Sequence, residues 1–114
     1  MANNPNWIKI AEHPNELGFG SNHIAVTEVN GKKICVGRHQ DRFFGFAHKC
    51  PHAGAPMVNG FIDPLGNVVC PLHRYKFSMK TGLNVSGEGY HLKTWPVDWL
   101  EDGVYINMGE TGLF

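Results

Sequence analysis

Apolar and polar residues alternate over short stretches of this chain, as they do in half-buried β-strands. In the first half of the sequence the pattern predicts strands at residues 7–10, around Ile24 and Val26, at 33–37 and at 42–47. Asn30-Gly31 separates the second and third of these strands. Both residues tolerate positive φ, so the pair predicts a type I′ hairpin turn.

The second half of the sequence continues the same alternation. It predicts short strands at residues 61–62, 68–69, 76–79, 91–97 and 104–107. Turn residues at 63–67 and 101–103 separate neighbouring strands. No apolar stripe with helical spacing has a convincing length. Short strands with frequent turns indicate an all-β fold, an antiparallel sandwich or barrel.

Composition narrows the classes of protein. The 114 residues include 14 glycines, 7 prolines and equal numbers of basic and acidic side chains, 10 of each. This length predicts a single domain over residues 1–114. A formal net charge of zero gives no reason to expect nucleic acid or a membrane surface as partner. Residues 1–10 lack the apolar run of a signal peptide, so we expect a cytoplasmic protein.

Cysteine and histidine concentrate in two loops. The first contains Cys50-Pro51-His52, the second contains Cys70-Pro71-Leu72-His73, and residues 53–69 lie between them. Each loop supplies one thiol and one imidazole. Zinc would bind all four groups in one tetrahedron, whereas a 2Fe–2S cluster of mixed ligation would place two histidines on one of its irons. Zinc fingers usually group like ligands together, so the mixed pairs favour the cluster.

With these motifs the sequence resembles the Rieske family, and in particular its small ferredoxins. The resemblance covers nearly the whole chain. It implies that Cys50 and Cys70 bind one iron and that His52 and His73 bind the other. It also implies an antiparallel β base into which a small cluster-binding subdomain, at about residues 47–77, is inserted.

Departures from other branches of the family bear on the reduction potential. Respiratory Rieske proteins place serine and tyrosine hydroxyls near the cluster, where this chain has Tyr75 and Phe77. Fewer hydrogen bonds to sulfur lower the potential, so we expect about −150 mV, the low end of the Rieske range. Lys49 and Arg74 flank the ligands and would each oppose this lowering by about 20–90 mV. The loop at 85–90 carries Glu88, which would lower the potential if it lies close to the cluster.

Other candidate residues have simpler interpretations. Cys35 lies between two apolar strand residues and is expected to be a buried thiol. His48 is expected to bond loop backbone groups rather than a metal. Trp95 and Trp99 are expected to belong to the core.

The resemblance implies an electron carrier rather than an enzyme. It suggests a ferredoxin that passes single electrons from a flavoprotein reductase to a terminal oxygenase. The chain is too short to hold the catalytic iron domain of such an oxygenase. One alternative is the small subunit of an NAD(P)H-dependent assimilatory nitrite reductase, bound to its large subunit. An alternative of another class is a zinc-stabilised interaction module.

Overall fold

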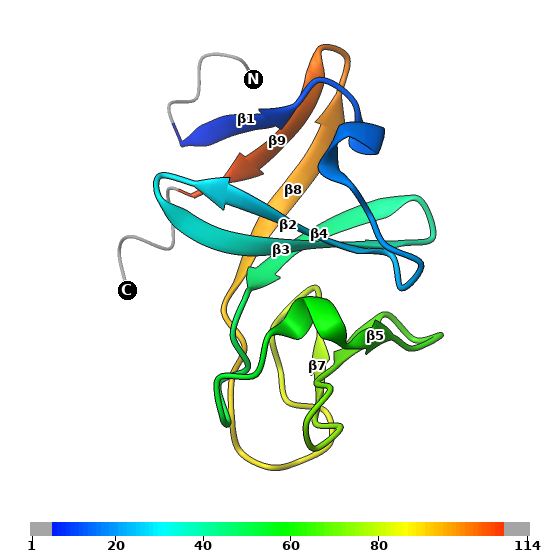
Figure 1. Ribbon diagram of the computed structural model, residues 1–114, viewed down its shortest axis with the longest axis vertical. Coiled ribbons are helices and arrows are strands. Elements are labelled where there is room, and N and C mark those ends of the chain that lie inside the picture. Colours follow the sequence, from blue (N-terminus) through cyan, green and yellow to red (C-terminus); the bar gives the residue numbers. More distant parts are fainter. Residues whose placement is uncertain (1–5, 109–114) are drawn as a thin grey trace.

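A computed structural model describes residues 6–108, which form two antiparallel sheets (Figure 1). The larger sheet has six strands in the order β1-β9-β8-β4-β3-β2. Its strands are β1 (Trp7–Ala11), β2 (Ile24–Val29), β3 (Lys32–His39), β4 (Arg42–Ala47), β8 (Thr94–Leu100) and β9 (Gly103–Asn107). This curled sheet is the base of the molecule. The predicted all-β class is therefore confirmed.

The β2–β4 meander follows the sequence pattern closely. Asn30 and Gly31 have φ values of 53° and 80°, which confirms the predicted type I′ turn. The next turn uses Gln40 and Asp41, again both at positive φ. Strand β4 has the predicted bounds. Cys35 pairs with Phe46 in the β3–β4 register, and both are fully buried.

The smaller sheet consists of β5 (Phe61–Ile62), β6 (Asn67–Val69) and β7 (Lys76–Ser78). It lies below the base in Figure 1. The chain enters this lower part after β4 and returns to the base at β8. Phe46 of β4 pairs with Thr94 of β8, so the two crossings lie side by side.

Two expectations about the second half of the chain are wrong. The strand predicted at 91–97 begins only at Thr94, because residues before it form a loop in which His91 makes an isolated bridge to Leu83. Trp99, expected in the core, is 51% exposed; its ring lies edge-on against Phe43. Val97, two residues earlier, lies on the same face of β8 and is buried, so the period of two does not account for the exposure of Trp99.

Two short 3₁₀ helices, η1 (Pro14–Leu17) and η2 (Met57–Asn59), interrupt the strands. Neither has an apolar stripe of helical length. Helix η1 begins at Pro14, and the imidazole Nδ1 of the preceding His13 accepts a hydrogen bond from the Asn15 N–H at 3.1 Å. No helix between residues 6 and 108 is long and apolar enough to cross a membrane.

Two clusters of buried side chains stabilise the fold. One lies in the base and includes Ile34, Trp95 and Ile106. The other joins the base to the smaller sheet and includes Phe46 and Phe77. Ala47, the last residue of β4, packs against both clusters. The smaller sheet is therefore packed onto the base rather than tethered to it by its two connections alone.

Candidate metal centre

The two cysteine-histidine loops have matching backbone geometry. In the first, the Cys50 N–H donates to the Ala55 carbonyl at 2.9 Å and the Cys50 carbonyl accepts from Gly54 at 2.8 Å. In the second, Cys70 makes the corresponding bonds to Tyr75 and Arg74 at 2.8 and 3.0 Å. The backbone N–H and carbonyl of each cysteine are thus both hydrogen-bonded to residues at the end of its own loop. The two loops therefore hold their cysteines in the same way.

Each loop also turns through the left-handed region at the corresponding position. Gly54 has φ 76° and Arg74 has φ 61°. Glycine adopts this conformation without steric cost, whereas a side chain such as that of Arg74 is strained there. The second loop therefore accepts some strain to keep an arginine directly after His73.

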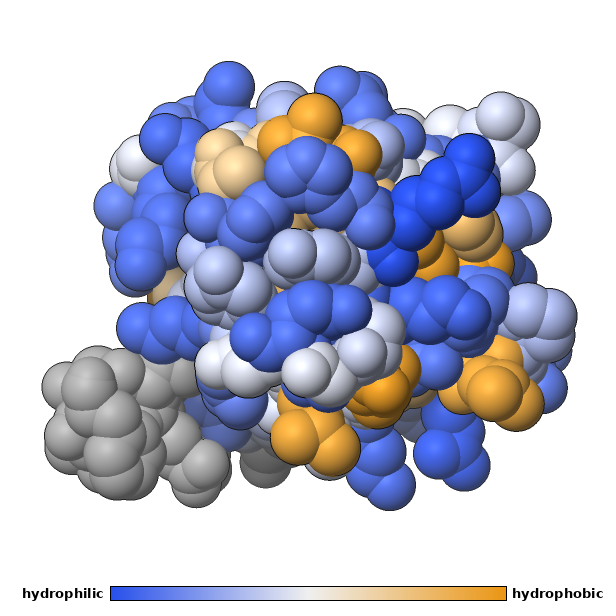
Figure 2. Space-filling model, turned by 90° about the horizontal axis from the view of Figure 1, so that it is seen from below, coloured by the Kyte–Doolittle hydropathy of each residue, from blue (hydrophilic) through white to orange (hydrophobic). Residues whose placement is uncertain are grey.

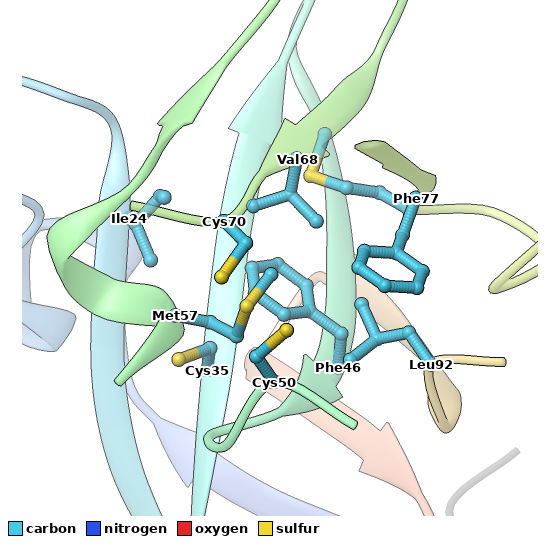
Figure 3. Packing of buried hydrophobic residues seen from close by; sticks show 10 residues of the cluster. Ile24, Cys35, Phe46, Cys50, Met57, Val68, Cys70, Phe77 and Leu92 are labelled. Atoms are coloured by element: carbon cyan, nitrogen blue, oxygen red, sulfur yellow. The ribbon is translucent and has the colours of Figure 1, made fainter. Parts of the chain in front are cut away.

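The two thiols are buried beneath the loops. Cys50 is 2% exposed and Cys70 is 1% exposed, and both lie in the cluster with Phe46 and Met57 (Figure 3). Burial raises the pKa of Cys50, and the neighbouring Cys70 thiol raises it further, while the backbone N–H of His52 lowers it. The sulfur atoms thus face the protein interior, where a bound metal could be kept from water.

The two imidazoles meet at the surface. His52 is half-buried and His73 is exposed, and their Nδ1 atoms are 3.2 Å apart. The four predicted residues are thus arranged as a buried thiol pair and an outer imidazole pair. A 2Fe–2S cluster with two histidines on one iron requires this division of ligands. The residues present therefore fit such a cluster.

A single zinc ion would need a different arrangement. Among the residues that the structure describes, no three His, Cys, Asp or Glu side chains converge so that they could hold one metal ion. A structural zinc site usually has four ligands in one tetrahedron. The four groups instead divide into a buried thiol pair and an outer imidazole pair, which is the arrangement that the cluster needs.

Tyr75 and Tyr90 cover His52. Their ring centroids lie 4.6 and 5.3 Å from that of the imidazole, and the two tyrosine rings stack at 5.9 Å with an interplanar angle of 25°. Tyr75 was predicted to lie beside the ligands. Tyr90 was missed, because nothing in its local sequence indicates which loop its ring will contact.

Asn84 holds the loop that carries Tyr90. It is only 8% exposed, and its Oδ1 accepts from the backbone N–H groups of Glu88 and Tyr90 at 2.8 and 3.2 Å. Its Nδ2 donates to the Lys76 carbonyl at 3.0 Å and to Glu88 Oε1 at 3.0 Å. The side chain therefore ties the loop at 85–90 to strand β7.

Glu88 is itself fixed by this network. A hydrogen bond from Ser86 lowers the pKa of its carboxyl, which partial desolvation opposes, and Asn84 and the nearby His52 lower the pKa further. The carboxyl is thereby stabilised as a carboxylate on the side of the site that carries His52. Sequence alone indicated the charge but not its position.

The remaining predicted residues surround the loops. Lys49 and Arg74 are exposed and flank Cys50 and His73 in the chain. Phe77 of β7 is fully buried in the cluster that joins the smaller sheet to the base. The expectation for His48 is wrong, since its ring lies against the buried thiol of Cys35, with Nδ1 and Sγ 3.9 Å apart. The buried position expected for Cys35 is confirmed.

The outer surface around the loops is mostly polar. Figure 2 views this end from below, with apolar side chains in separate patches rather than one continuous area. The exposed large apolar residues of the smaller sheet and its loops are Phe61, Leu65, Leu72, Leu83, Val85 and Tyr90.

A fold of two antiparallel sheets with paired Cys/His loops defines an iron–sulfur electron-transfer domain. The sequence profile of the Rieske [2Fe-2S] domain matches residues 6–96. The chain belongs to the Rieske family, and the cofactor of that family is one 2Fe–2S cluster. The comparison thus agrees with the division of thiols and imidazoles and not with zinc.

Two curated relatives show how the family uses such a domain. The chain is 30% identical over 78 residues to the 3-phenylpropionate/cinnamic acid dioxygenase ferredoxin subunit of Photorhabdus laumondii, covering 68% of this chain and 74% of that one. It is 38% identical over 55 residues to human apoptosis-inducing factor 3, covering 48% of this chain. The match spans only 9% of the length of that human protein.

Solved structures share the fold. The ferredoxin of carbazole 1,9a-dioxygenase from Nocardioides aromaticivorans is 19% identical, with a TM-score of 0.75 over 90% of this chain and 97% of its own. A protein proposed to be the small subunit of an NADPH nitrite reductase is 22% identical. It also has a TM-score of 0.75, over 88% of this chain and 96% of its own.

Proposed function

We propose that Cys50 and Cys70 hold one iron of the 2Fe–2S cluster and that His52 and His73 hold the other. The observation that carries this assignment is the spatial division of the four groups. The thiols are buried in the hydrophobic cluster, and the two imidazole Nδ1 atoms lie 3.2 Å apart at the surface. The cluster accepts and releases one electron when bound.

The surroundings of the ligands set the expected potential. Phe77 is buried and has no hydroxyl, so it donates no hydrogen bond to a sulfur. Glu88 adds a negative charge on the side of His52, which disfavours an added electron. Lys49 and Arg74 act in the opposite direction. We therefore expect a potential near the low end of the Rieske range, at about −150 mV.

In this proposal the chain is an electron carrier and not an enzyme. It passes single electrons from a flavoprotein reductase to a terminal oxygenase, as the relatives named as ferredoxin components of dioxygenase systems suggest. The exposed imidazole of His73 would give the acceptor an approach to the site. A cytoplasmic location is part of the same proposal.

A second candidate role is the small subunit of a nitrite reductase. It is favoured by the structural likeness to the protein proposed to have that role. The two roles differ in their complexes. The carrier should be isolated by itself and exchange electrons with a reductase, whereas the subunit should copurify with a large subunit that contains sirohaem.

We further propose that residues 1–114 make one domain with the cluster-binding part inserted in the base. The sequence predicts this part at about 47–77, and the chain returns to the base at β8, so the inserted part extends to about residue 93. The packing of Ala47 against both hydrophobic clusters supports this division. A single cooperative unfolding transition, seen alike in absorption of the cluster and in far-ultraviolet circular dichroism, is the expected behaviour.

The decisive experiment is electron paramagnetic resonance of the dithionite-reduced protein. Mixed Cys/His ligation predicts an average g of about 1.9, with roughly two irons and two sulfides per chain. His73→Ala should abolish the signal. His48→Ala is the matched control, because its ring contacts Cys35 instead, and it should retain the signal. A colourless protein containing one zinc, or a normal signal in His73→Ala, would overturn the assignment.

A further inference from the structure

Lysines gather around a groove at the junction of the base and the smaller sheet. The groove has a volume of about 370 Å³, and its walls are Lys32, Lys33, Ala47, His48, Lys49, Lys93 and Trp95. We name it the lysine groove. All four lysines are exposed, while Trp95 is buried at 3% exposure. The groove thus combines an apolar wall with several positive charges.

The ring of Trp95 contacts two of these lysines. The ammonium groups of Lys32 and Lys93 each lie 5.7 Å from the centroid of its ring, a separation at which a cation is attracted to an indole. These contacts hold the two lysines beside the groove. A carboxylate that binds there meets charges that are already in position, which reduces the entropy lost on binding.

Most of this positive charge is not neutralised within the described chain. Glu28 lies opposite Lys33 in the β2–β3 register and offsets part of its charge. Lys32, Lys49 and Lys93 form no ion pair with any residue between 6 and 108. Because the whole chain has a formal net charge of zero, the lysine groove is a local concentration of charge rather than part of a basic protein. A nucleic acid, which needs an extended basic surface, fits it less well than a small acidic segment does.

The lysine groove adjoins both chain crossings that lead to the metal centre. Ala47 ends β4, and its N–H donates to the Lys93 carbonyl at 2.9 Å. Lys49 directly precedes Cys50. Figure 1 shows these crossings between the base and the smaller sheet. A protein seated in the groove would therefore lie next to the first cysteine-histidine loop.

We propose that the lysine groove docks an acidic segment of a redox partner, in which carboxylates flank an apolar side chain. The carboxylates pair with Lys32, Lys49 and Lys93, and the apolar side chain packs against Ala47 and Trp95. This inference rests on the proposed electron-carrier function. Such charge pairing steers association and is weakened by salt.

The probe for the test is a capped five-residue peptide that alternates glutamate and leucine. It is titrated into the ¹⁵N-labelled, cluster-loaded protein while the indole N–H signal of Trp95 is followed. We expect a saturable shift of that signal, with affinity falling as salt increases from about 50 to 300 mM. The matched peptide with glutamine in place of glutamate should bind at least about fivefold more weakly.

Variants locate the binding. Lys32→Gln/Lys93→Gln should weaken binding of the glutamate peptide about fivefold or more, as expected for two partly exposed charge pairs. Lys80→Gln removes the same kind of charge elsewhere on the surface and should leave affinity within about twofold. Lys93→Gln alone, which retains Lys32 beside Trp95, should have an intermediate effect and guards against a folding defect in the double variant.

Three outcomes would overturn the proposal: an unshifted Trp95 signal, equal binding of the glutamine peptide, or equal weakening by Lys80→Gln. The paramagnetic signal and potential of the cluster are measured on the same samples. If the signal is normal and binding is absent, the docking inference alone fails. If no Rieske signal is found, the proposed function fails whether or not the peptide binds.

Discussion

Replacing Asn84 with alanine should release the loop at 85–90 from strand β7. The asparagine side chain links the Lys76 carbonyl of the strand to the backbone N–H groups of Glu88 and Tyr90. Alanine can make none of these bonds. Without them, Tyr90 loses the support that keeps its ring against His52.

The expected loss of stability follows from the three backbone contacts. A hydrogen bond contributes about 0.5–1.5 kcal/mol net. The loop amides regain water because residues 85–90 are exposed, whereas Asn84 itself is buried. Three such bonds together contribute about 1.5–4.5 kcal/mol. Because the loop amides regain water, we expect the free energy of unfolding to fall by an amount in the lower half of this range, about 2–3 kcal/mol. For a chain of this size that lowers Tm by roughly 10–15 °C.

The same change should raise the reduction potential. An oxidised 2Fe–2S cluster with two thiolates and two neutral imidazoles has zero net charge, and reduction makes it −1. Release of the loop moves the Glu88 carboxylate away and admits water to the side of His52. Both changes stabilise the reduced form, so the potential becomes more positive.

Three measurements test this reasoning on Asn84→Ala: chemical denaturation, redox titration, and hydrogen exchange at the Glu88 and Tyr90 amides. Asn15→Ala, an exposed asparagine in η1, is the control and should change stability by less than about 0.5 kcal/mol. Glu88→Gln separates the effect of the carboxylate charge from the effect of water entry beside His52, because it removes the charge and retains a hydrogen-bond acceptor. A loss below about 1 kcal/mol with unchanged exchange at both amides would refute the role given to Asn84.

Three further predictions concern other parts of the fold. Gly82→Ala should lower the free energy of unfolding by several kcal/mol and disturb the smaller sheet. Gly82 has a φ of +82°, and a Cβ there would lie 1.9 Å from the Leu92 carbonyl oxygen. Gly87→Ala, at φ +89° with nothing within 4 Å, should cost only about 1 kcal/mol, and equal denaturation midpoints for the two variants would contradict the argument. Burial raises the pKa of the Asp63 carboxyl, but hydrogen bonds from Asn67 and Leu65 and the charge of Lys76 outweigh it, so the net pKa is lowered. The contribution of the Asp63 carboxylate to the free energy of unfolding should be full above about pH 4 and lost as pH falls through the folded-state pKa. Asp63→Asn should therefore reduce the dependence of stability on pH in the acid range. The same pH dependence in the variant and the parent would contradict this role for Asp63. Burial raises the pKa of Cys35 to about 12, so its thiol should resist iodoacetamide at about pH 8.5 until the protein is unfolded, as mass spectrometry would show; rapid labelling of the folded chain would argue against a buried thiol.

The parts of the fold that sequence predicted are those controlled by local physics. Asn30-Gly31 forms its turn because both residues accept positive φ, and β4 has its predicted bounds because apolar residues and turn residues define it. The grouping of Cys50, His52, Cys70 and His73 was equally readable, since ligand type and spacing are recorded in the chain itself.

Features that depend on contacts between distant segments could not be predicted in this way. Tyr90 contacts His52 only because Asn84 bonds the intervening loop to β7, and no residue near Tyr90 indicates that contact. Trp99 lies on the same face of β8 as the buried Trp95 and Val97, yet it is 51% exposed near the end of the strand, which the alternation in the sequence does not reveal. His48 is half-buried against Cys35 of the neighbouring strand, a contact that spacing alone does not reveal.

The pairing of β1 with β9 affects the order in which the molecule can fold. Trp7 of β1 is the register partner of Asn107 of β9, so β1 cannot join the base until β9 has been synthesised. Contacts between residues so far apart in sequence form slowly. During synthesis, both cysteine-histidine loops leave the ribosome before β8 and β9 complete the base. The buried cluster that contains both thiols draws its residues from Ile24 to Leu92, so all of its members are synthesised before the C-terminal hairpin that completes the base.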